Sequence, residues 1–112
     1  MSFVYYISAP RIGSQDPVLG EKLIHNFFLK LLSAPEKPSH LLFLEAGVKL
    51  LLPDSSAITA LKILQDEDEV ELLACKTCLQ HYGIGDKVAA GRVSSMEEII
   101  AIMQRSDKVI HL

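Results

Sequence analysis

The chain has 112 residues, 49% of them apolar, and a formal net charge of −3. Its mean hydropathy of +0.26 excludes an intrinsically disordered protein, because disorder requires low hydrophobicity and high net charge. The acidic balance argues against nucleic-acid binding, which usually needs a basic surface, and no apolar run is long enough to cross a membrane.

The first third of the chain predicts a strand followed by a long helix. Phe3–Ser8 is rich in residues that favour strands, and it stops before Pro10. Asp16 followed by Pro17 predicts a capped helix start, because a proline at the first helical position loses no hydrogen bond. An apolar stripe then continues at helical spacing until Pro35. The stripe comprises Leu19, Leu23, Ile24, Phe27, Phe28, Leu31 and Leu32.

The middle of the chain predicts two more strands and a second helix. His40–Leu44 and Val70–Ala74 are continuous apolar runs of strand length. Val48–Leu52 either extends the first of these strands or forms the loop after it, since periodicity does not separate the two. A helix begins after Pro53–Ser56, and the acidic run 66–69 follows it as a solvated turn. The expected inner face of this helix is Ile58, Leu61 and Leu64.

The last third predicts two helices between short strands. Lys76–Tyr82 is a short helix, and Val88–Val93 is a weak strand interrupted by a glycine. Ser95 and Glu98 have the spacing of a capping box and start a final helix, after which Lys108–Leu112 forms a strand. The expected inner face of the final helix is Met96, Ile99, Ile100 and Met103.

The alternation of short, wholly apolar strands with helices predicts the fold class. Such strands are typical of a parallel sheet that is covered on both faces. We expect one α/β domain over residues 1–112, with three α/β/α layers and a mostly parallel sheet of about five strands. The chain start has no basic residues before its apolar run, so we expect no secretory signal and a cytoplasmic location.

Cys75 and Cys78 are the only cysteines and form a Cys-x-x-Cys pair. Two cysteines do not make a disulfide framework, so the pair indicates an intracellular protein with a local thiol site. Ligands of parallel sheets bind beyond the carboxyl ends of the strands, and Cys75 directly follows a predicted strand. The start of the next helix and the charge of Lys76 favour the thiolate of Cys75.

Three interpretations of this pair remain open. It is a reactive sulfur-handling or redox site, part of a metal site, or two semi-buried small apolar side chains. We expect no metal and no cofactor, because a four-coordinate zinc site needs a second ligand pair.

Two charged residues and a histidine are expected near the cysteine pair. Glu45 and Lys49 flank Gly47 on a loop at the same edge of the sheet, where they either orient a substrate or stay solvated. His81, one helical turn after Cys78, is a proton partner or a surface histidine.

Several short motifs follow one another along the chain. They are Gly-x-x-Asp-x-x-Leu-Gly at 13–20, Gly-Val-Lys-Leu at 47–50, Cys-x-Thr-Cys-Leu at 75–79, Tyr-Gly at 82–83, Asp-Lys at 86–87 and Lys-Val-Ile-x-Leu at 108–112. In this order they resemble the DsrE/DsrF-like family of small sulfur-relay proteins. Within that family the chain is most similar to the C-terminal DsrE-like domain of YedF-type proteins, which are linked to selenium metabolism.

The resemblance implies a DsrE-like α/β/α domain that forms homo-oligomers and carries sulfane sulfur as a persulfide on a cysteine. In the family this cysteine ends a strand eight residues before a glycine, and Cys75 and Gly83 have that spacing. Cys78 is then an accessory or resolving thiol. YedF-type proteins have an additional domain similar to the sulfur carrier TusA, so we expect a TusA-like carrier or a cysteine desulfurase as partner.

The chain departs from the family pattern at two places. Glu45-Ala46 stands where the pattern has Asn-Ser, and Lys76 stands where it has Gly. A carboxylate near Cys75 disfavours its thiolate, whereas Lys76 favours it. The substrate contacts expected from these positions are Glu45, Lys49 and Lys76.

The sequence leaves three functions open. The first is a sulfurtransferase-like persulfide carrier in which Cys75 and Cys78 perform the chemistry. The second is a non-catalytic oligomeric scaffold or regulatory subunit with incidental thiols. The third is a dithiol redox switch that carries no sulfur.

Overall fold

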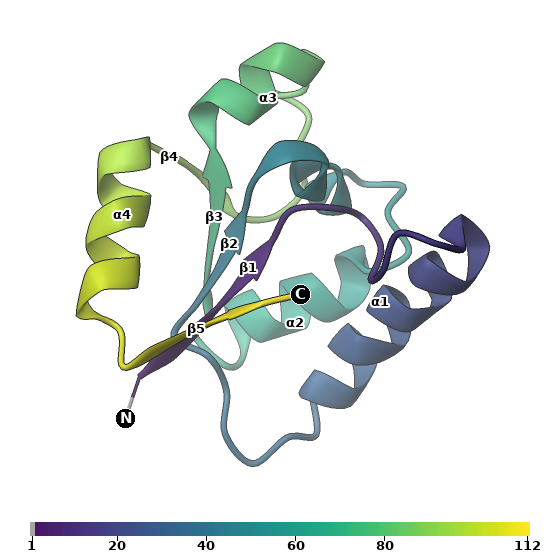
Figure 1. The fold of residues 1–112 in the computed structure, drawn as a ribbon, viewed down its shortest axis with the longest axis horizontal. Coiled ribbons are helices and arrows are strands. Elements are labelled where there is room, and N and C mark those ends of the chain that lie inside the picture. Colours follow the sequence, from purple (N-terminus) through teal and green to yellow (C-terminus); the bar gives the residue numbers. More distant parts are fainter. Residues whose placement is uncertain (1) are drawn as a thin grey trace.

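A computed structural model describes residues 2–112 and contains a five-stranded parallel sheet (Figure 1). The strand order is β4-β3-β2-β1-β5, and every neighbouring pair is parallel. The strands are β1 (Phe3–Ile7), β2 (His40–Phe43), β3 (Glu71–Cys75), β4 (Arg92–Ser94) and β5 (Lys108–His111). The predicted α/β fold and the expected strand number are therefore confirmed.

Helices lie on both faces of this sheet, as Figure 1 shows. They are α1 (Pro17–Leu31), α2 (Ile58–Asp66), α3 (Lys76–Tyr82) and α4 (Met96–Arg105), together with the 3-10 helix η1 (Glu45–Leu51). The larger apolar cluster lies between the sheet and α1 and α2. A smaller cluster lies between the sheet and α4, and it includes Cys75.

Helix α1 begins where the sequence predicts. The Asp16 carboxylate accepts a hydrogen bond from the Leu19 N–H at 3.1 Å, which satisfies a free amide of the first turn. The apolar stripe is wider than the face that packs on the sheet. Ile24 and Phe28 are buried, whereas Leu19 and Leu23 remain 52% and 43% exposed.

The segment Val48–Leu52 belongs to neither of the two predicted states. Residues 45–51 form η1, which passes over the carboxyl end of β1. Gly47 lies so close to β1 that a Cβ there would collide with the Ile7 carbonyl. Only a residue without a side chain lets η1 pass at this distance. The predicted strand Val88–Val93 is also shifted, since β4 begins only at Arg92.

The predicted inner face of α4 is partly wrong. Ile99 and Ile102 are buried against the sheet and Met103 packs beside them, but Met96 and Ile100 are 44% and 43% exposed. A helix that meets one sheet buries a narrow stripe, and apolar residues at helical spacing form two overlapping stripes here. Periodicity alone does not tell which of the two faces the sheet.

The start of α4 is held by a network around Glu98. Ser95 caps the helix by accepting the Glu98 N–H at 3.2 Å, as predicted. The Glu98 carboxylate does not complete the box, because Arg92 donates two hydrogen bonds to it at 2.9 and 2.7 Å and Ser94 donates one at 2.6 Å. These partners lower the pKa of Glu98 from 4.5 to about 2, chiefly through Arg92.

This network predicts an acid-dependent contribution to stability. Because the pKa of Glu98 is lower in the folded than in the unfolded protein, its ionised carboxylate stabilises the native state above pH 4.5. This contribution is lost as the pH falls from 4.5 towards 2. The variant Glu98→Gln should therefore show a smaller loss of stability than the wild type over this interval. Urea unfolding at several pH values measures this. Equal pH dependence in both proteins would contradict the role of Glu98.

Candidate functional site

The carboxyl end of β3 brings two thiols together. Cys75 is the last residue of β3 and the N-cap of α3, as the sequence predicts, with extended backbone angles of φ −60° and ψ 122°. Cys78 lies in the first turn of α3. Both cysteines are free, and they lie 3.3 Å apart. Two thiols at this separation can exchange a sulfur atom or form a disulfide without a large backbone movement.

The two thiols differ in their accessibility. Cys75 is only 2% exposed and belongs to the apolar cluster beneath α4. Cys78 is half-buried and lines a pocket of about 300 Å³. The other residues that line this thiol pocket are Glu45, Thr77, His81 and Tyr82. A molecule in the pocket therefore meets Cys78 directly.

Cys78 receives a hydrogen bond from the neighbouring segment. The N–H of Glu45 donates to the Cys78 Sγ at 3.0 Å. Burial raises the pKa of the Cys78 thiol above 9.0, the hydrogen bond with Cys75 raises it further, and the Glu45 N–H opposes both effects. Cys78 is consequently a thiol at neutral pH and must lose its proton before it reacts.

Tyr6 of β1 is a site residue that sequence reasoning missed. Its ring packs against the apolar cluster that contains Cys75, edge-on to the His111 ring at 4.8 Å. Burial raises the pKa of Tyr6, and the neighbouring Cys78, Glu45 and Cys75 raise it further, so its phenol stays neutral. In the sequence Tyr6 is one residue of an apolar strand. Only the pairing of β1 with β2, and of β2 with β3, brings it near the thiols.

The three predicted substrate contacts occupy different surroundings. Glu45 lines the thiol pocket and is exposed there. The Nζ atom of Lys49 lies 4.4 Å from the centre of the Tyr82 ring, which holds the lysine against the pocket wall by a cation–π interaction. Lys76 is exposed at the start of α3, outside the group of residues that line the pocket. The structure thus brings Glu45 to Cys78 and Lys49 to Tyr82.

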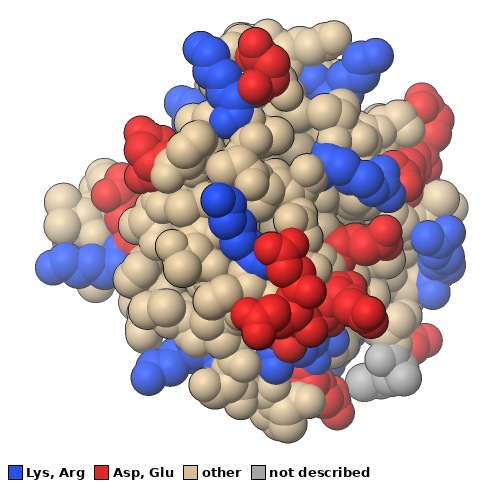
Figure 2. Space-filling model, turned by 180° about the vertical axis from the view of Figure 1, so that it is seen from behind, with Lys and Arg blue, Asp and Glu red and all other residues tan. Residues whose placement is uncertain are grey.

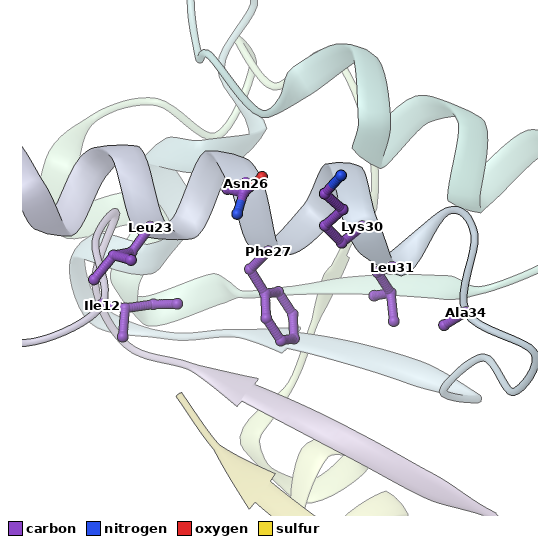
Figure 3. A pocket seen from close by; sticks show the side chains of 7 residues that line it. All are labelled: Ile12, Leu23, Asn26, Phe27, Lys30, Leu31 and Ala34. Atoms are coloured by element: carbon purple, nitrogen blue, oxygen red, sulfur yellow. The ribbon is translucent and has the colours of Figure 1, made fainter.

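A second hollow lies along α1, well separated in sequence from the thiols (Figure 3). It has a volume of about 460 Å³ and a largely apolar lining. Its lining residues are Ile12, Leu23, Asn26, Phe27, Lys30, Leu31 and Ala34. This set contains no thiol, carboxylate or imidazole, whereas the lining of the thiol pocket contains all three.

Residues 2–112 show neither a metal-binding cluster nor a membrane-spanning helix. In this range no group of three or more His, Cys, Asp or Glu side chains is arranged to hold a metal ion. Among the helices of the same residues, none has the length and apolarity needed to span a membrane. Figure 2 shows basic side chains scattered among acidic and uncharged ones on the face seen from behind.

Comparison with known proteins places the chain in a family. Residues 23–112 match the sequence model of the DsrE/DsrF-like family. The chain belongs to this family. The match includes Cys75, Cys78 and all strands except β1. No curated protein sequence matches the chain significantly.

Two solved structures share the fold over essentially the whole chain. The ychN protein from E. coli has a TM-score of 0.69 and 19% identity, with 100% of both chains covered. MTH1491 from Methanobacterium thermoautotrophicum, a protein of unknown function, has a TM-score of 0.68 and 22% identity, with 99% of this chain and 98% of that one covered. At these identities the two structures establish the DsrE-like fold.

Proposed function

We propose that the protein is a sulfur-relay protein that carries sulfane sulfur as a persulfide on Cys75. The observation that supports this function best is the pair of free thiols 3.3 Å apart beside a pocket at the carboxyl edge of a parallel sheet. Ligands of such sheets bind at this edge. The DsrE/DsrF-like family, to which the chain belongs, is often connected with sulfur relay.

The chemistry is a thiol–persulfide exchange with no net oxidation. A cysteine thiolate attacks the outer sulfur of a donor persulfide, the donor S–S bond breaks, and the donor leaves as a thiolate. The sulfur then passes to an acceptor thiolate by the same reaction. Cys78 also offers a release route, because its attack on the inner sulfur of the Cys75 persulfide forms a Cys75–Cys78 disulfide and expels hydrosulfide.

Partners and setting follow from the same proposal. The donor is a cysteine desulfurase or a TusA-like sulfur carrier, and the protein works in the cytoplasm as a relative of YedF-type proteins. Glu45 and Lys49 would contact the donor at the pocket, and Lys76 would contact it outside the pocket, at the start of α3. Exposed apolar side chains on β4 and α4 support a homo-oligomer, since such surfaces usually cover one another. These side chains are Val93, Met96 and Ile100.

The test of this function is intact-protein mass spectrometry after incubation with a cysteine desulfurase and cysteine. We expect the wild type to gain one sulfur that a reductant removes once the protein is denatured, and the double variant Cys75→Ser/Cys78→Ser to gain none. No gain by a wild-type protein with free thiols would refute the relay. The scaffold would then be the better explanation.

A dithiol redox switch is the second candidate, and it is favoured by the short distance between the cysteines. A peroxide or a disulfide would oxidise the pair to a Cys75–Cys78 disulfide and itself be reduced by two electrons. Titration against glutathione buffers separates the two functions. A pair that titrates near the cytosolic potential and gains no sulfur from the desulfurase is a switch.

A further inference from the structure

The two thiols of the site are placed unequally with respect to the pocket. We propose that Cys78 is the loading thiol: it takes the sulfur from the donor and passes it to Cys75. This inference rests on the proposed function and assigns the order in which the two cysteines act. The family spacing selects Cys75 as the carrier, but it does not say how a donor reaches that side chain.

Burial closes the direct route to Cys75. Its exposed fraction is 2%, and it belongs to the buried apolar cluster beneath α4 that also contains Leu44, Leu73 and Ile99. A protein donor presents its persulfide on a cysteine side chain, which must come within bonding distance of the attacked thiolate. Cys75 does not line the thiol pocket, so a donor reaches it only if the apolar cluster opens.

Cys78 has the opposite surroundings. It lines the pocket together with polar side chains that a sulfur donor can contact, among them Thr77 and His81. The Glu45 N–H at 3.0 Å points to its sulfur and stabilises the negative charge that appears when the proton leaves through the pocket. Cys78 is therefore both the thiol that a sulfur donor meets first and the thiol that accepts a hydrogen bond from the Glu45 N–H.

The transfer between the two cysteines is balanced and needs no oxidant. The Cys78 thiolate attacks the outer sulfur of the donor persulfide, and the donor leaves as a thiolate. The Cys75 thiolate then attacks the outer sulfur on Cys78, the bond from that sulfur to Cys78 breaks, and Cys78 regains a proton. Cys75 and Cys78 lie 3.3 Å apart. A sulfur–sulfur bond is about 2 Å long, so the outer sulfur of a persulfide on Cys78 can reach Cys75.

The experiment measures the initial rate of sulfur gain from a cysteine desulfurase and cysteine, quenched with iodoacetamide and followed by peptide mass spectrometry. We expect Cys78→Ser to load about tenfold more slowly than the wild type, or slower still, because access controls such exchanges. In Cys75→Ser we expect the added sulfur to be found on Cys78, where it remains because the second thiol is missing. Gln80→Ala, an exposed position on the same helix, is the control for disturbance of α3.

The outcomes separate this inference from the proposed function. If no variant and no wild-type sample gains sulfur, the relay function fails and the loading role falls with it. If Cys78→Ser loads as fast as the wild type, the relay stands and the order of the thiols is wrong. Sulfur that stays on Cys78 in the wild type and never reaches Cys75 would overturn the transfer step. Circular dichroism confirms that each variant is folded.

Discussion

Replacing Cys75 by serine is expected to abolish the retention of sulfane sulfur when a competing thiol such as glutathione is added. In the wild type the persulfide lies on a side chain that is 2% exposed, where glutathione does not reach it. In Cys75→Ser the sulfur stays on Cys78 in the open pocket and is removed. The measurement is the fraction of protein with one added sulfur before and after the thiol challenge.

The control for this prediction is a second variant that removes the thiol of Cys75 without adding a polar group. Cys75→Ala replaces the buried thiol by a small apolar side chain, which avoids leaving an unpaired hydroxyl in the apolar cluster. After the glutathione challenge, both variants should contain no more added sulfur than the double variant Cys75→Ser/Cys78→Ser. If either retains sulfur under glutathione as the wild type does, then Cys75 is not the carrier, and the family spacing to Gly83 has been misread.

Replacing Gly47 by alanine is expected to destabilise the protein by about 1–3 kcal/mol, the usual effect of forcing atoms into a packed interior. The added Cβ would collide with the carbonyl of Ile7 and lie 3.3 Å from the Ala9 nitrogen. Both are backbone atoms, one in the last residue of β1 and one in the loop after it, so neither can rotate away as a side chain would. Urea unfolding followed by circular dichroism gives the change in the free energy of unfolding.

The same substitution should also alter the thiol site. Gly47 and Glu45 lie on the same 3-10 helix, so a shift of η1 moves the N–H that is hydrogen-bonded to the Cys78 Sγ. We expect Cys78 to react with iodoacetamide at a different rate in Gly47→Ala. Gly85→Ala is the matched control, because a Cβ there meets only Leu79 at an ordinary 3.9 Å. Equal destabilisation by both variants would contradict a specific role for the η1 crossing.

Local signals in the sequence determined most of the fold. Asp16 and Ser95 cap helices through hydrogen bonds within three residues, so their effect is visible in the sequence itself. The strands β2 and β3 are apolar runs because both of their faces are covered, and this predicts a parallel sheet. The position of Cys75 between a strand and a helix follows from the same local pattern.

The tertiary structure alone decided how the site is composed. The register of β1, β2 and β3 brings Tyr6 to the cysteines, and the path of η1 directs the Glu45 N–H to Cys78. Which of the two thiols is buried depends on α4, which packs on the sheet at Ile99. These are contacts between segments far apart in the chain, and their geometry depends on how whole elements pack. The sequence by itself therefore determined the elements and the thiol pair, because periodicity and capping are local, whereas only packing decided which thiol meets the pocket.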